Sequence, residues 1–238
     1  MYTSTSNDFI KSIKKLNEKK YRDNQSLFLV EGEHLVLEAI KHNIAKYIIV
    51  RDDYDFDYDN KIVVNNKVMK YISNLDNPSG IVAVCNKINN TKIGSKILIL
   101  DNIQDPGNLG TIIRSLVAFN FDTLVLSNNT VDLYNSKVIR ATQGMLFKIN
   151  VIITDIEEFI NSLDGYKIIG TDVVNGENVK NFKKIEKFAI IVGNEGKGIS
   201  SNIKKLCSDN IYIPISNDCE SLNVGVAASI IMYELGDL

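Results

Sequence analysis

Short apolar runs alternate with segments of helical periodicity along most of this chain. The apolar runs, each short enough for a buried strand, lie at residues 27–30, 47–50, 62–64, 81–84, 97–100, 124–126, 168–170, 189–192 and 211–213. Before the first run and between several others, apolar residues recur at intervals of three and four, which predicts helices over residues 8–17, 35–40 and 68–75 and from residue 109. Strands that alternate with helices predict an α/β fold.

A strand, a loop, a helix and a second strand are predicted between Ile97 and Leu126. The loop, Asp101 to Asn108, is rich in turn-forming residues and follows a buried strand, where α/β sheets bind ligands. We expect Asn108 to cap a helix that begins at Leu109. On this helix Arg114 leans back toward the loop, and its guanidinium suits an anionic group such as phosphate. The alternative is a well-capped turn followed by a surface cation.

Residues 86–95 are polar and carry no helical pattern. Because they separate two apolar strands, they predict a linker between domains. The N-terminal domain would then comprise residues 1–88, and the C-terminal domain residues 96–238. Both lengths are ordinary for a folded domain.

Basic side chains are unevenly distributed, although the net charge is −2. Residues 11–22 carry six basic side chains, Arg22 among them, against one acidic side chain. Lys137 and Arg140 lie three residues apart on a predicted helix that a glycine interrupts, so they share a face. Each group suits either a phosphate backbone or a solvated helix surface. The five aspartates of residues 52–59 would repel a phosphate backbone.

Composition favours a cytoplasmic protein without a metal. The three cysteines form no C-x-x-C pair, which argues against a disulfide framework or a zinc site. His34 and His42 are eight residues apart, which is not the spacing of a metal-binding pair. No apolar run is long enough to span a membrane, and the N-terminus lacks the pattern of a signal peptide.

Two further loops follow predicted strands in the C-terminal part. The glycines of Gly193 to Ser200, G-N-E-G-K-G-I-S, free the backbone to approach a ligand and hold Glu195 at the loop's edge. This loop matches neither the P-loop nor the dinucleotide-binding pattern, which disfavours nucleoside triphosphatases and classical dinucleotide enzymes. The small residues of Ser221 to Ser229, S-L-N-V-G-V-A-A-S, suit a helix packed tightly in a core or a dimer.

Together the three loops resemble the motifs of SpoU-type, TrmH-like RNA 2′-O-ribose methyltransferases of the SPOUT superfamily. The matches are N-x-x-D-P-x-N-x-G-x-x-x-R from Asn102 to Arg114, G-N-E-G-x-G from Gly193 to Gly198, and I-P-I and S-L-N-V-x-V-A between Ile213 and Ala227. The N-terminal part resembles the substrate-binding domain of many members, an α/β domain similar to small RNA-binding ribosomal proteins. This second resemblance favours ribosomal RNA over transfer RNA.

The resemblance implies a parallel sheet with a deep trefoil knot in the C-terminal domain. It also implies S-adenosylmethionine as methyl donor and a homodimer formed through the C-terminal helix and the knot. The residues that match the family's cofactor site are Gly193, Ile213, Ser221, Leu222 and Asn223.

By the same resemblance, Arg114 acts on the ribose 2′-hydroxyl, and Asn108 and Glu195 orient Arg114 and the methyl donor. Ser221 and Asn223 complete the catalytic set as residues of the pocket wall. Arg22, Lys137 and Arg140 are the candidate contacts to substrate RNA.

The chain departs from the family pattern at two places. Gly225 stands where Ser or Ala is usual, and residues 216–219 lack the glycine often found there. Neither position carries a predicted catalytic side chain, so we expect activity. The alternatives are a transfer RNA 2′-O-methyltransferase, a non-catalytic RNA-binding ribosome-assembly protein on the same fold, and a methyltransferase that acts on protein or a small molecule.

Overall fold

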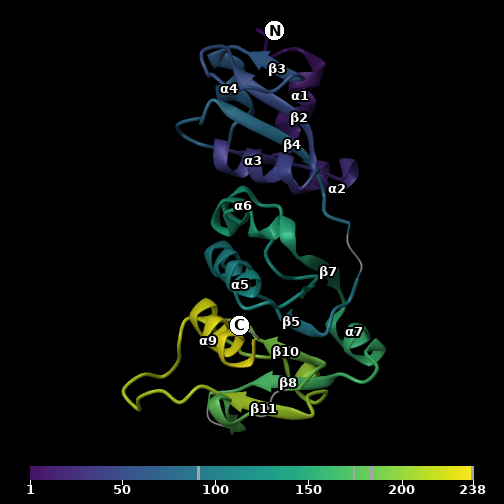
Figure 1. Cartoon of the computed structure of the whole chain (residues 1–238), viewed down its shortest axis with the longest axis vertical. Coiled ribbons are helices and arrows are strands. Elements are labelled where there is room, and N and C mark those ends of the chain that lie inside the picture. Colours follow the sequence, from purple (N-terminus) through teal and green to yellow (C-terminus); the bar gives the residue numbers. More distant parts are fainter. Residues whose placement is uncertain (90–91, 174, 183–184, 237–238) are drawn as a thin grey trace. The chain divides into compact units, whose positions relative to one another are not determined.

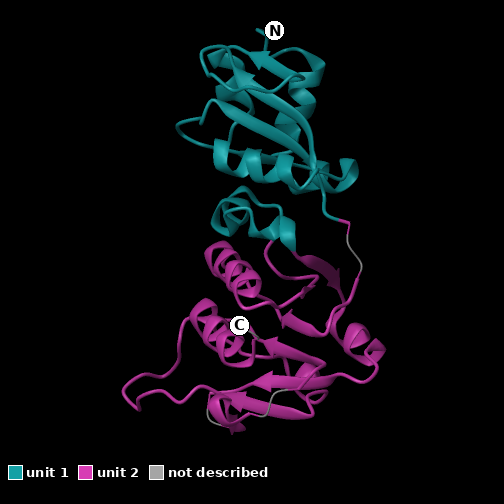
Figure 2. Cartoon of the chain, viewed as in Figure 1, with its two compact units in different colours: residues 1–88, 132–148 teal, residues 89–131, 149–238 magenta. Residues whose placement is uncertain are grey.

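The computed structural model describes residues 1–89, 92–173, 175–182 and 185–236. The chain divides into two compact units (Figure 2). Unit 1 comprises residues 1–88 and 132–148, and unit 2 comprises residues 89–131 and 149–238. Of the predicted linker 86–95, residues 90–91 lie outside the described residues. None of the helices that the structure describes has the length and apolar character needed to cross a bilayer.

Unit 1 contains a four-stranded mixed sheet with strand order β1-β4-β2-β3. Strands β2, β3 and β4 are labelled in Figure 1. Its strands are β1 (Leu27–Glu31), β2 (Ala45–Arg51), β3 (Lys61–Val64) and β4 (Ile81–Asn86). Strand β4 is antiparallel to β1 and β2, whereas β2 and β3 are parallel. The helical segments of unit 1 are α1 (Asp8–Lys15), α2 (Lys19–Gln25), α3 (Glu33–Lys41), α4 (Asn66–Ile72), α6 (Ser136–Thr142) and the short 3₁₀ helix η1 (Met145–Lys148).

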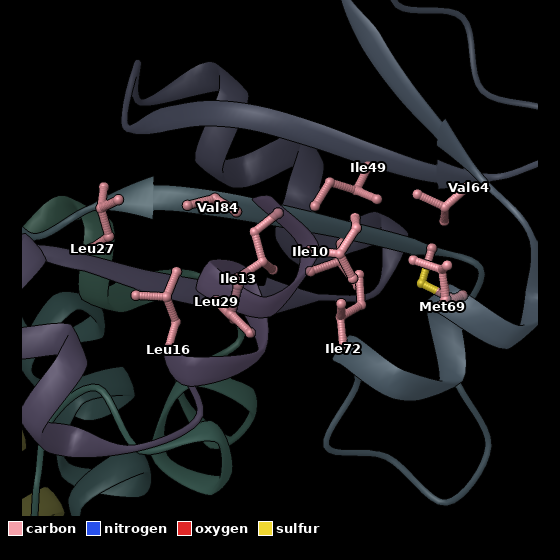
Figure 3. Packing of buried hydrophobic residues seen from close by; sticks show 12 residues of the cluster. Ile10, Ile13, Leu16, Leu27, Leu29, Ile49, Val64, Met69, Ile72 and Val84 are labelled. Carbon is pink, nitrogen blue, oxygen red and sulfur yellow. The ribbon is translucent and has the colours of Figure 1, made fainter. Parts of the chain in front are cut away.

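Helices α1 and α4 contribute to an apolar core on one face of this sheet (Figure 3). Ile10 and Ile13 of α1 pack with Ile72 of α4 and with sheet residues such as Leu29 and Val84, all of them buried. The predicted apolar stripe of residues 8–17 is therefore the buried face of α1, as helical periodicity requires.

Residues 132–148 cluster with the N-terminal residues, although we assigned them to the C-terminal domain from the sequence. Arg22 donates a hydrogen bond to the Leu16 carbonyl at 2.8 Å and forms an ion pair with Asp132. The Phe28 ring lies 4.7 Å from that of Tyr134. The prediction that Arg22 contacts RNA is wrong, because its side chain is buried, only 7% exposed, and committed to this internal ion pair.

Unit 2 contains a seven-stranded sheet with strand order β7-β6-β5-β10-β8-β11-β9. Every strand pairing that the structure describes in this sheet is parallel, which confirms the predicted parallel α/β domain. The strands are β5 (Lys96–Leu100), β6 (Thr123–Ser127), β7 (Asn150–Thr154), β8 (Lys167–Thr171), β9 (Glu177–Asn178), β10 (Phe188–Val192) and β11 (Asp209–Tyr212). The helical segments are α5 (Pro106–Ala118), α7 (Ile156–Ser162), α8 (Ser201–Lys204), α9 (Val224–Leu235) and the 3₁₀ helix η2 (Val179–Asn181).

Strands β5 and β10 are central neighbours in unit 2, with Leu100 paired to Val192 at their carboxyl ends. All five residues of β10 are buried, as the continuous apolar run predicted. Because the two strands are parallel, the loops that follow them leave the same edge of the sheet. This arrangement brings the first and second sequence motifs together.

Candidate functional site

Asp101 fixes the first motif loop to the second. It follows β5 directly and is only 3% exposed. Its Oδ2 accepts hydrogen bonds from the backbone N–H of Ser200 at 2.8 Å and from the Ser200 hydroxyl at 2.7 Å. Asp101 was not among the predicted site residues, although a carboxylate directly after a buried strand is the feature that identifies it.

Helix α5 begins three residues earlier than predicted. Its N-cap is Asp105, whose Oδ1 accepts the N–H of Asn108 at 2.8 Å, and Pro106 occupies the first helical turn. The predicted cap at Asn108 is wrong, because proline is favoured at the first helical position and the aspartate before it supplies the cap. The Asn108 side chain is consequently available to the other loops.

Side chains from all three motif loops form one chain of hydrogen bonds. Asn108 Nδ2 donates to Glu195 Oε1 at 3.1 Å, and Asn223 Nδ2 donates to Asn108 Oδ1 at 3.0 Å. Glu195 Oε1 also accepts the backbone N–H of Asp105 at 3.3 Å. The three motif loops therefore meet, and Asn108 links the other two.

The second motif loop turns back on itself. The backbone groups of Asn194 and Gly198 exchange two hydrogen bonds, of 3.0 and 2.9 Å, and Asn194 Nδ2 donates to the Asn102 carbonyl at 2.8 Å. A Cβ atom at Gly193 would lie 2.1 Å from the carbonyl carbon of Gly198. Only glycine fits at position 193 while the loop keeps this shape.

A cavity of about 650 Å³ lies among the loops after β8, β10 and β11 and the start of α9. Its lining includes every residue predicted to hold the cofactor, namely Gly193, Ile213, Ser221, Leu222 and Asn223, together with Glu195. Asp172 and Lys204, which no sequence pattern indicated, also line the cavity and form an ion pair of 2.6 Å.

Arg114 is exposed on α5 and is not among the residues that line this cavity. Its side chain forms no hydrogen bond or ion pair within the described part of the chain. The helix that carries it is held against α9, because the hydroxyls of Ser115 and Ser229 are 2.7 Å apart. A Cβ at Gly225 would lie 3.4 Å from the Thr111 side chain, which is an ordinary contact distance, so α5 and α9 approach closely at this departure from the family pattern.

Lys137 and Arg140 lie on α6 in unit 1, whereas Arg114 lies in unit 2. Lys137 is exposed, and Arg140 is partly buried, with its Nη1 lacking a hydrogen-bond partner among the described residues. Gln143 and Gly144, both with positive φ, separate α6 from η1, so the helical segment is interrupted where the glycine predicted.

Comparison with known proteins decides the family. The profile of the SpoU rRNA methylase family matches residues 95–233, and that of the MRM3-like substrate binding domain matches residues 7–83. The chain belongs to the SpoU rRNA methylase family. It is 37% identical to the 23S rRNA (guanosine(2553)-2′-O)-methyltransferase RlmP of Bacillus subtilis, and the match covers 98% of this chain and 97% of that protein.

Solved structures of other SpoU and TrmH relatives match both units. The AdoMet-bound rRNA methyltransferase of Sinorhizobium meliloti has a TM-score of 0.84 at 27% identity, over 98% of this chain and 95% of that one. A putative TrmH-family RNA methyltransferase of Porphyromonas gingivalis has a TM-score of 0.85 at 26% identity, over 96% of this chain and 97% of that one. This SpoU chain is therefore an S-adenosylmethionine-dependent RNA 2′-O-methyltransferase.

The cavity of this SpoU chain fits that cofactor. Its volume lies within the usual range for sites of small ligands, and residues such as Val192 and Ala227 give it apolar walls. The backbone of Ile213 and Leu222 makes no hydrogen bond within the described residues, so its N–H and C=O groups are available to a ligand. Glu195 places a carboxylate at the cavity, which suits a cationic sulfonium compound.

Proposed function

We propose that this chain methylates the 2′-hydroxyl of one guanosine in 23S ribosomal RNA. The proposal is carried by the hydrogen bonds through which Asn108 joins the first motif loop to Glu195 and Asn223, both of which line the cavity. The choice of nucleotide rests on the B. subtilis relative, which is matched over nearly its whole length and is named for guanosine 2553 of 23S rRNA.

The cofactor site proposed from the sequence consists of Gly193, Ile213 and Leu222, with Ser221 and Asn223 beside them. Bound S-adenosylmethionine supplies an electrophilic methyl group. The backbone groups of Ile213 and Leu222 would hold its polar edges, since they have no partners among the described residues. Gly193 allows the 193–198 loop to form this part of the cavity wall, because any side chain at position 193 would displace the loop.

Arg114 is proposed to act on the ribose as it attacks. An arginine stays protonated throughout the accessible pH range, so its role is to stabilise the developing negative charge on the 2′-oxygen or to hold a neighbouring phosphate. Its guanidinium has no internal partner among the described residues and is exposed on α5, so it is available to RNA. Asn108 and Glu195 are positioning residues that tie the start of α5 to the cavity.

Three further features of the proposal come from the family resemblance. A homodimer formed through α9 is supported by two exposed apolar side chains on that helix, Val226 at 46% and Tyr233 at 58% exposure. The other two features are a trefoil knot in residues 96–238 and a cytoplasmic location. In unit 1, the exposed Lys137 is proposed as an RNA contact, together with Arg140, which is partly buried on the same helix.

The experiment maps 2′-O-methyl groups in RNA from cells that contain or lack this protein, and repeats the reaction with purified protein and labelled S-adenosylmethionine. We expect one guanosine of 23S rRNA to lose its methyl group in the deleted strain. The Arg114→Ala variant should bind the cofactor normally yet transfer methyl groups at least about a hundredfold more slowly, the usual loss for one transition-state donor. A label found only in transfer RNA would contradict the proposed substrate, and wild-type protein without transfer to any RNA would indicate a non-catalytic RNA-binding protein.

A further inference from the structure

Lys197 is presented at the cavity by a backbone with little freedom. Its N–H donates to Asn194 Oδ1 at 3.2 Å, and the two backbone hydrogen bonds between Asn194 and Gly198 enclose it in a tight turn. Gly198 adopts φ +68°, a conformation that favours glycine. The loop thus fixes the point from which the Lys197 side chain extends.

Among the described residues, the charged groups around the cavity leave Lys197 without a partner. Lys204, which also lines the cavity, is neutralised by its 2.6 Å ion pair with Asp172. Glu195 is engaged by the N–H groups of the first motif loop. Within the described part of the chain, the Lys197 ammonium forms neither an ion pair nor a hydrogen bond. A cavity-lining cation in this state is available to an anionic ligand.

We propose that Lys197 is a positioning residue that binds a phosphate of the substrate RNA next to the methylated nucleotide. This inference rests on the proposed function and adds a substrate contact to it. The location of Lys197 favours RNA over the carboxylate of the methyl donor, because residues 195–198 are the exposed part of the loop whereas Gly193 is buried. An exposed ammonium on this loop is accessible to the phosphate backbone of an RNA that binds outside the cavity.

Lys197 also complements the residues already assigned. It lies two positions from Glu195, whose hydrogen bond to Asn108 joins this loop to the helix that carries Arg114. A phosphate bound by Lys197 would therefore lie on a loop that is hydrogen-bonded to α5, the helix that carries Arg114. Such a contact limits the positions available to the ribose. Positioning the 2′-hydroxyl against the methyl group is the main task in a methyl transfer between two bound partners.

The test compares Lys197→Ala, Lys197→Arg and the control Lys205→Ala. Lys205 is an exposed lysine at the end of α8, and it is not among the described residues that line the cavity. RNA affinity is measured at several salt concentrations with a 23S rRNA fragment that contains the target guanosine. Affinity for S-adenosylmethionine is measured separately by calorimetry without RNA.

We expect Lys197→Ala to raise the Kd for RNA roughly five- to tenfold at low salt, the loss of one charge-assisted contact. The slope of log K against log salt should fall by about 0.7 to 0.9, and the affinity for S-adenosylmethionine should stay unchanged. Lys197→Arg should restore both RNA properties, and Lys205→Ala should leave them at the wild-type values.

Weaker cofactor binding with an unchanged salt slope would overturn the inference in favour of a carboxylate contact. Unchanged values in both assays would show a solvated lysine and would equally overturn it. The RNA-binding assay needs no methyl transfer. A wild-type protein that binds the fragment but does not methylate it would refute the proposed function, whereas the affinities and salt slopes of the variants would still decide whether Lys197 binds RNA.

Discussion

Replacing Gly193 by alanine tests the architecture of the cavity most directly. The new Cβ would lie 2.1 Å from the carbonyl carbon of Gly198 and 2.2 Å from the nitrogen of Ile199. An ordinary contact needs about 3.4 Å or more, so the backbone at residues 198–199 must move by more than 1 Å. That movement breaks the two hydrogen bonds between Asn194 and Gly198, each contributing roughly 1 kcal/mol.

We therefore expect Gly193→Ala to lower the free energy of unfolding by about 2 kcal/mol and to weaken binding of S-adenosylmethionine at least about tenfold. Urea denaturation gives the first quantity and calorimetry the second. Gly196→Ala is the matched control in the same loop, because its Cβ would meet only Asn194 Oδ1 at 3.8 Å. If Gly193→Ala bound the cofactor as tightly as wild type while remaining folded, the loop would not form the wall that we describe.

The remaining predictions concern the cap of α9, the buried ion pair and the thiols. Asn223→Ala removes the N-cap of α9 and should lower the free energy of unfolding, measured in urea, by about 1 kcal/mol. Asn223→Asp keeps the cap but loses the amide N–H that donates to Asn108, so it should lower methyl transfer without that loss of stability. Asp132→Ala leaves Arg22 buried without its ion-pair partner and should destabilise unit 1 by about 3 kcal/mol, whereas a change below 0.5 kcal/mol, also measured in urea, would contradict this reading. Iodoacetamide should label the exposed Cys219 rapidly and the native Cys85 hardly at all, since burial raises the pKa of the Cys85 thiol, and mass spectrometry of the alkylated peptides checks the order.

Most of the site could be predicted because its residues follow strands that read as continuous apolar runs. Ile97 to Leu100 and Ala189 to Val192 are fully recognisable as buried strands, and they are neighbours in the sheet. Parallel neighbours place their following loops at one edge, so the motifs after these strands had to meet. The small residues after Asn223 likewise indicated close packing, which the structure shows between α5 and α9.

The wrong predictions concern residues whose local sequence pattern fits two structures, so that only the three-dimensional fold shows which one forms. Both Asp105 and Asn108 are good cap residues, and the choice between them depends on Pro106, which fits the first helical turn. Arg22 belongs to a basic stretch that suits RNA, but its ion pair with Asp132 spans 110 positions of sequence and leaves no local pattern. Helix α2 was missed because its lysine-rich sequence shows no apolar stripe.

The hydrogen bond between Asn108 and Asn223 has a consequence for the order of events during synthesis. Its two residues are 115 positions apart, and the bond from Asn108 to Glu195 spans 87. A nascent chain that has exposed the first loop must therefore wait for more than a hundred further residues before the cavity closes. Translation products that end before Ile213 would lack the cavity wall contributed by residues 213–223, so such fragments could not enclose the methyl donor.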